Sequence, residues 1–309
     1  MTRTFNTRMV FRTMGALLLL EAIFMAIAMG VSLWYKEADT GIFLISTIIT
    51  LLAGVIGLCI GRRAESRMGE REGYVIVAMV WVVFSAFGLL PYYLSGQVPT
   101  FTDAWFESMS GFTTTGATII PNLDVITHGL LFWRSLTQWI GGMGIIVLSI
   151  AILPIFGLNG MQLYAAEVTG LTYEKLSPRI SDTAKMMWTT YVILTASEIL
   201  GLWLCGMPIF DAVCHSFSTI ATGGFSTKNN SLEFYDSAAI HYLVTFFMFV
   251  SGINFVILIY LVSGKARNFF RDEEFRWYTV AVVLFSLLLT IGLYIARPGW
   301  TAMHMERSF

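Results

Sequence analysis

The sequence predicts an all-α membrane protein of repeated helix–pore loop–helix units, with about seven transmembrane spans plus two re-entrant pore helices. Three observations support this fold class. The 309 residues are 56% hydrophobic and only 13% charged, about half the charged share of a typical soluble domain. Seven apolar stretches approach or exceed the roughly 20 residues that a helix needs to cross a bilayer. Two shorter Thr/Gly-rich segments lie between spans and resemble each other.

The seven candidate spans follow one another along the chain. In order they are Met14–Trp34, Gly41–Ile60, Gly73–Leu94, Gly129–Phe156, Met186–Gly206, Ala238–Ser263 and Trp277–Ala296. The first has the basic start of a secretory signal peptide, but Glu21 interrupts its apolar stretch and a second span follows at once. We therefore interpret it as a retained helix.

Lysine and arginine residues predict the orientation of these spans. Fourteen fall in clusters at residues 3–12, 62–71, 175–185 and 265–276, whereas five lie in the alternate segments. Because positive charge gathers on the cytoplasmic side, we expect a multi-pass protein with a cytoplasmic N-terminus. The net charge of −1 gives no basic surface for nucleic acid, so the lipid bilayer is the expected surrounding.

Two segments, residues 101–118 and 209–226, are too polar and too short to cross. When they are aligned at an offset of 108 residues, six of the sixteen positions from Asp103 to Thr118 are identical without a gap. Each is expected to begin as a helix whose N-terminus is capped by Asp103 or Asp211. Non-helical backbone at membrane depth must be buried in protein or line a watery cavity. We therefore interpret each segment as a re-entrant pore loop.

Threonine and glycine suit a potassium filter, in which backbone carbonyl oxygens replace the water around the ion. Glycine tolerates the positive φ that helps to point consecutive carbonyls toward one axis, and Gly116 and Gly224 are the candidates. The C-terminal end of each short helix would favour a cation. Two alternatives stay open: plain external loops, and a transporter with helices broken at the membrane midplane. No nucleophile–base or metal constellation indicates an enzyme or a cofactor.

Several polar and small residues lie inside the predicted spans and pore helices. For Glu198 we expect either a pair with Arg134 or a functional role. Glu107 and His215 occupy equivalent repeat positions and are expected to pack or cap behind the filter. Two groups of small residues predict either close helix packing or a bend. They are Gly141, Gly142 and Gly144 in the fourth span, and Ser251, Gly252 and Asn254 in the sixth.

Four stretches are individually distinctive: FESMSGFTTTGATII (106–120), QWIGGMGIIVLSIAILPIFGLNGMQLYAAE (138–167), PRISDTAK (178–185) and HSFSTIATGGFST (215–227). On these stretches the chain resembles the TrkH/KtrB branch of the Trk/Ktr/HKT potassium transporter superfamily. The two extra N-terminal spans resemble the TrkH type. The resemblance implies potassium uptake across the bacterial cytoplasmic (inner) membrane, with potassium as the transported ligand and no cofactor.

The resemblance also implies filter residues and partners. Carried over by position, the first filter is Thr113, Thr114, Thr115 and Gly116, and the second is Ala221, Thr222, Gly223, Gly224 and Phe225. The family's architecture implies a homodimer. It also implies a cytosolic, nucleotide-binding regulatory ring protein of the TrkA type as partner.

The family has four span–pore–span repeats, and this sequence contains two complete ones. We expect two N-terminal helices in residues 1–65, a first repeat in 72–165, a second in 180–265, and the first helix of an incomplete third repeat in 275–309. The expectation is therefore a product truncated after the second repeat. The alternative function is a non-conducting truncated fragment or assembly subunit.

Overall fold

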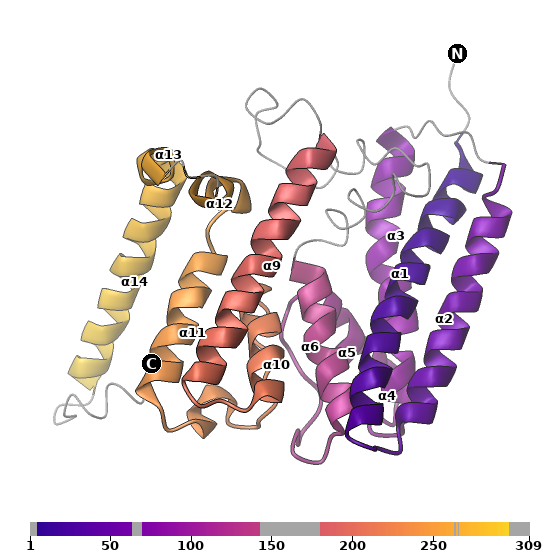
Figure 1. The fold of residues 1–309 in the computed structure, drawn as a ribbon, viewed down its shortest axis with the longest axis horizontal. Coiled ribbons are helices and arrows are strands. Elements are labelled where there is room, and N and C mark those ends of the chain that lie inside the picture. Colours follow the sequence, from indigo (N-terminus) through magenta and orange to yellow (C-terminus); the bar gives the residue numbers. More distant parts are fainter. Residues whose placement is uncertain (1–4, 64–69, 143–179, 263, 265, 297–309) are drawn as a thin grey trace.

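The computed structural model describes residues 5–63, 70–142, 180–262, 264 and 266–296, and this part of the chain is helical without a strand (Figure 1). The helices are α1 (Thr7–Trp34), α2 (Thr40–Ile60), α3 (Glu70–Gly88), α4 (Leu90–Leu94), α5 (Phe101–Phe112), α6 (His128–Gly142), α9 (Ile180–Leu204), α10 (Ile209–Ile220), the 3₁₀ helix η2 (Ser231–Phe234), α11 (Ala238–Ser251), α12 (Phe255–Val262), α13 (Ala266–Arg271) and α14 (Glu273–Ala296). The predicted all-α membrane fold is confirmed.

Five segments are long and apolar enough to cross a membrane: Thr7–Trp34, Thr40–Ile60, Arg71–Leu94, Lys185–Leu204 and Glu273–Gly292. They coincide with five of the seven predicted spans. The predicted span Gly129–Phe156 is described only as far as the end of α6. Its remainder, the last part of the predicted first repeat, and residues 297–309 lie outside the described residues.

The predicted span Ala238–Ser263 is not one continuous helix. Helix α11 ends at Ser251, and α12 begins at Phe255 and leaves in another direction (Figure 1). Tyr278 from α14 donates a hydrogen bond to the carbonyl of Phe249 at 3.0 Å, close to the end of α11. A Cβ on Gly252 would lie 2.3 Å from that tyrosine oxygen. Both expectations for these small residues are met here, because the helix is interrupted and Gly252 leaves room for Tyr278.

The predicted aspartate caps of the two short helices are wrong. Thr100 caps α5, where its hydroxyl accepts a hydrogen bond from the amide of Asp103 at 3.1 Å. Pro208 precedes α10 and makes no side-chain cap. Asp103 and Asp211 instead lie in the first helical turn, where a carboxylate interacts favourably with the positive end of the helix dipole.

A loop from the N-terminal hairpin fixes the start of α6. The carboxylate of Glu37, between α1 and α2, accepts hydrogen bonds from the amides of His128 at 2.9 Å and Gly129 at 3.1 Å. It also contacts the imidazole Nδ1 of His128 at 2.8 Å. Because the first amides of a helix lack partners within the helix, Glu37 stabilises α6 and ties it to the N-terminal hairpin.

The hairpin of α1 and α2 depends on glycines at its contact. A Cβ on Gly15 would lie 2.6 Å from the carbonyl oxygen of Gly54, and one on Gly57 would lie 2.9 Å from the Cα of Gly15. Small residues of this kind let two membrane helices approach closely. The two helices are therefore closely packed, and their connecting loop supports α6.

Replacing Gly15 by alanine tests this contact. Because the new Cβ meets backbone atoms that cannot rotate away, we expect Gly15→Ala to lower the free energy of unfolding by about 1–3 kcal/mol. The matched control is Gly30→Ala, also in α1, where a Cβ has nothing within 4 Å. We expect it to leave stability unchanged or slightly higher. Unfolding in mixed detergent micelles measures both, and equal effects would contradict the close contact.

Candidate functional site

The two short helices repeat in the backbone as they do in the sequence. Helix α5 covers residues 101–112 and α10 covers residues 209–220, so both boundaries are offset by 108 residues. The turns that follow match as well. φ is +53° at Thr114 and +54° at Thr222, and it is +74° at Gly116 and +85° at Gly224. The repeat is therefore a repeat of conformation, extending through the predicted filter residues.

Positive φ at the two threonines was not expected from the sequence. A β-branched residue in the left-handed region is a genuine outlier. Both threonines follow a helix end at which the amide of the next residue bonds back to the carbonyl of Ser110 or Ser218, at 2.9 and 2.8 Å. This is a Schellman ending, and glycine usually takes its left-handed position. Strain of this kind often marks a functional site.

The two Thr/Gly turns meet. A Cβ on Gly116 would lie only 1.9 Å from the carbonyl oxygen of Gly223, so the two backbones are in contact. Their surroundings differ. Thr113 and Thr115 of the first turn are exposed, and their hydroxyls bond to each other at 2.8 Å. In the second turn burial alternates along the chain: Ala221, Gly223 and Phe225 are buried, and the two residues between them are exposed.

Gln138 of α6 supports the second turn from behind. Its side-chain oxygen accepts hydrogen bonds from the hydroxyl of Ser218 at 2.7 Å and from the amide of Phe225 at 3.2 Å. A Cβ on Gly223 would lie 2.3 Å from the Gln138 side-chain carbon Cδ. Only glycine fits at position 223, because any side chain there would collide with Gln138. The hydrogen bonds of Gln138 in turn fix the path of the turn.

The glycines of α6 let it touch the ends of both short helices. A Cβ on Gly141 would lie 2.0 Å from the carbonyl oxygen of Phe112, at the end of α5. One on Gly142 would lie 2.5 Å from the Cα of Ala221, just past α10. Both glycines lie at the end of the described part of α6, and at both the structure shows close packing. Gly144 lies outside the described residues.

A buried ion pair joins α6 to the first short helix. The Nε of Arg134 lies 2.5 Å from a carboxylate oxygen of Glu107, and both side chains are almost completely buried. Glu107 also accepts hydrogen bonds from the hydroxyl of Thr118 at 3.1 Å and the amide of Ile119 at 3.0 Å. The carboxylate therefore holds the chain that leaves the first turn.

Arg134 also reaches the second turn. Its Nη1 donates to the carbonyl of Ser226 at 2.9 Å. Its guanidinium carbon lies 3.5 Å from the centre of the Phe225 ring, a cation–π geometry. One arginine therefore bonds to both segments, and only one of its bonds is to a charged group.

The structure separates Glu198 from Arg134, so the pair considered from the sequence is wrong. Glu198 is fully buried and lies close to the hydroxyl of Thr219 in α10. His215, the positional equivalent of Glu107, is buried with its ring nearly perpendicular to that of Tyr235, and no described group bonds to its Nε2. The two repeats thus have the same backbone conformation, but the side chains that pack behind the turns make different contacts.

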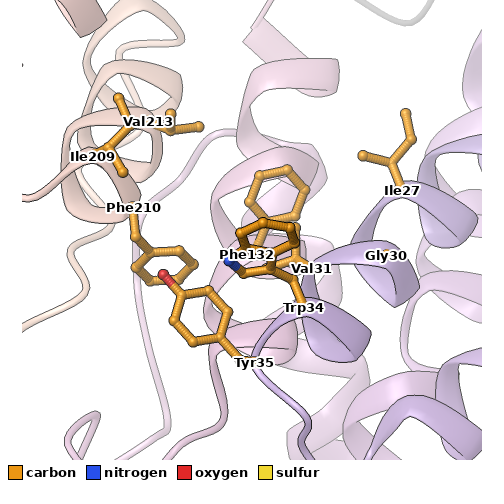
Figure 2. A pocket seen from close by; sticks show the side chains of 9 residues that line it. All are labelled: Ile27, Gly30, Val31, Trp34, Tyr35, Phe132, Ile209, Phe210 and Val213. Carbon is orange, nitrogen blue, oxygen red and sulfur yellow. The ribbon is translucent and has the colours of Figure 1, made fainter.

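A cavity of about 320 Å³ lies between α1, α6 and α10 and is distinct from the turns. Figure 2 shows its lining, which is Ile27, Gly30, Val31, Trp34, Tyr35, Phe132, Ile209, Phe210 and Val213. It carries no charged side chain and is unsuited to an ion. Within the described ranges, no three His, Cys, Asp or Glu residues cluster in a way that could hold a metal ion.

Comparisons with known proteins agree with this architecture. Residues 28–296 match the family model of TrkH, described as a cation transport protein. The chain belongs to the TrkH family. It is 42% identical over 290 residues to the Trk system potassium uptake protein TrkH of Salmonella typhimurium and 41% identical to that of Escherichia coli K12. Each match covers 93% of this chain and 60% of the relative.

A solved structure shares the fold. The crystal structure of the potassium transporter TrkH from Vibrio parahaemolyticus superposes with a TM-score of 0.84 at 35% identity, covering 98% of this chain and 62% of that one. The chain thus spans about three fifths of the length of the TrkH proteins it matches. Together with its apolar helices, the likeness makes it a multi-pass membrane protein.

A double-mutant cycle tests the buried ion pair. Arg134→Met leaves Glu107 buried without its cation, and Glu107→Gln leaves the arginine unpaired, so each is expected to cost about 3–5 kcal/mol. We expect the double variant to lose clearly less than the sum, as measured by unfolding in mixed detergent micelles. The control is Lys228→Gln, whose partly exposed contact with Asp211 is 3.8 Å long, with an expected cost of about 0–1 kcal/mol. Additive losses at Arg134 and Glu107 would contradict the pairing.

Proposed function

We propose that this chain takes part in potassium uptake across the bacterial cytoplasmic membrane, as the pore-forming part of a Trk-type transporter. Two of its relatives are named Trk system potassium uptake proteins. The proposed filter residues are Thr113, Thr114, Thr115 and Gly116 in the first turn and Ala221, Thr222, Gly223, Gly224 and Phe225 in the second. The observation that carries the proposal is the repeated pattern of positive φ in the two adjoining turns.

That pattern suits a dehydrated cation. In each turn, residues two positions apart have positive φ, which departs from the extended backbone whose carbonyls alternate in direction. Carbonyls gathered on one side replace the ion's water shell, as in potassium filters. The C-terminal ends of α5 and α10 lead directly into the turns, and their partial negative charge favours a cation there. A carbonyl site needs no cofactor, and we propose no enzymatic role.

The proposed pore has four filter segments, of which these are two. The exposed Thr113 and Thr115 leave a face on which further segments of a family-length protein would pack. The division into two N-terminal helices and helix–pore–helix repeats is part of this proposal. It is supported by the common offset of α5 and α10.

The proposed orientation, partner and oligomer are those that the resemblance to the family implies. The clustered arginine and lysine residues support a cytoplasmic N-terminus, and the same side would face a TrkA-like nucleotide-binding ring protein. A homodimer in the lipid bilayer is the proposed oligomer. No nucleic-acid partner is proposed, since the net charge is −1.

Two glycines with similar positive φ allow a controlled test of the filter. Gly224 (φ +85°) and Gly206 (φ +94°) both have open space where a Cβ would stand. Alanine at either site pays a similar cost of about 1–2 kcal/mol for the left-handed backbone. We expect Gly224→Ala to reduce the preference for rubidium over sodium and Gly206→Ala to keep it.

Rubidium and sodium fluxes into liposomes that contain the purified chain measure this preference, and growth of uptake-deficient cells at low potassium is the parallel readout. Equal preference in both variants, at comparable flux, would overturn the filter assignment. A family-length protein that contains this chain, folds and inserts but carries no rubidium would overturn the transport proposal and favour a non-conducting assembly subunit.

A further inference from the structure

A buried carboxyl group lies behind the first short helix without a partner. Glu21 of α1 is fully buried, and no described group hydrogen-bonds to either of its carboxyl oxygens. The hydroxyl of Ser108 in α5 is also buried without a partner among the described residues. Two unsatisfied polar groups in one place call for an explanation, because buried polar atoms nearly always have partners.

Gly88, at the end of α3, brings these two groups together. A Cβ on Gly88 would lie 2.7 Å from the Ser108 hydroxyl oxygen and 3.3 Å from Oε1 of Glu21. Both oxygens therefore face the same side of the glycine, and only its missing side chain leaves them room. They are not in direct hydrogen-bond contact, since both are unpartnered.

The surroundings favour the neutral form of Glu21. No salt bridge joins it to a cation in the described part of the chain. The ring of Phe112 lies on the same side of Gly88. A carboxylate in such a place would pay several kcal/mol of desolvation without compensation. A neutral carboxylic acid instead offers one hydroxyl donor and an acceptor, which is what a bound water molecule needs.

We propose that Glu21 is a neutral carboxylic acid that holds one buried water molecule against the hydroxyl of Ser108. Buried waters typically make about three hydrogen bonds to otherwise unsatisfied groups. Here the two carboxyl oxygens and the serine oxygen supply them. The water connects α1, which lies outside both repeats, to the helix that carries the first turn.

The consequence is a positioning role for Glu21. Ser108 lies two residues before Ser110, whose carbonyl accepts the hydrogen bond that closes the Schellman ending of α5. Movement of Ser108 is therefore passed to the first turn. The second helix has an equivalent serine, Ser216, which is also buried and unpartnered. Glu198 lies close to Thr219 of that same helix, and among the described residues no carboxyl group is placed beside Ser216 as Glu21 is beside Ser108, so Ser216 is a matched control.

Infrared spectroscopy of the purified chain tests the proposal without relying on transport. The C=O stretch of a protonated carboxyl group is separate from that of a carboxylate. We expect Glu21→Gln to remove one protonated component that Glu198→Gln leaves in place. Ser108→Ala removes one hydrogen-bond partner of the water and so weakens its bond to the carboxyl group, which should shift the Glu21 component to higher frequency, whereas Ser216→Ala should not.

Three results would overturn the proposal. The first is a protonated carboxyl band that Glu21→Gln does not change, which would make Glu21 ionised. The second is an equal response to Ser108→Ala and Ser216→Ala. The third is a density map that resolves ordered waters and shows none between Glu21 and Ser108. The positioning role itself predicts that Glu21→Gln, which keeps a donor and an acceptor, retains stability that Glu21→Leu loses.

Discussion

The buried pair of Arg134 and Glu107 is the interaction on which the site depends. Removing two charges from water costs several kcal/mol each, and the pair compensates only because further hydrogen bonds satisfy the remaining groups. Those further bonds go to the backbone just after each Thr/Gly turn, at Ile119 after the first and at Ser226 after the second. The charges are therefore stable only when both turns are in place, which makes the arrangement of the turns specific.

Helix α6 carries the side chains that hold both turns in place. Arg134, Gln138 and Gly141 recur at intervals of four and three residues, so they share one helix face. That face touches both turns and the end of α5. Glu37 holds the start of α6 from the N-terminal hairpin, and the proposed water would connect Glu21 of α1 to the first short helix. The N-terminal helices thus act as support for the repeats and do not stand apart from them.

The sequence predicted the parts of the site that repeat. The 108-residue offset located both turns, and Gly116 and Gly224 have the positive φ that was assigned to them. Sequence reasoning missed Gln138, because a glutamine in an apolar span gives no sign of its partner. It considered Glu198 as one possible partner of Arg134 and did not identify Glu107 as the partner, because the folding-back that brings Glu107 close is a tertiary effect. The positive φ of Thr114 and Thr222 is unfavourable for a β-branched residue. It could not be predicted locally, because the surrounding contacts impose it.

The central claim is that one ion pair couples the two turns. Solid-state NMR of the chain in lipid can follow the backbone signals of Gly116 and Gly224 when Glu107 is changed to glutamine. Both signals are expected to move, because the weakened pair frees Arg134 from its fixed position beside Ser226. A change at Gly116 with Gly224 unaffected would contradict it, and would mean that the two turns are held independently.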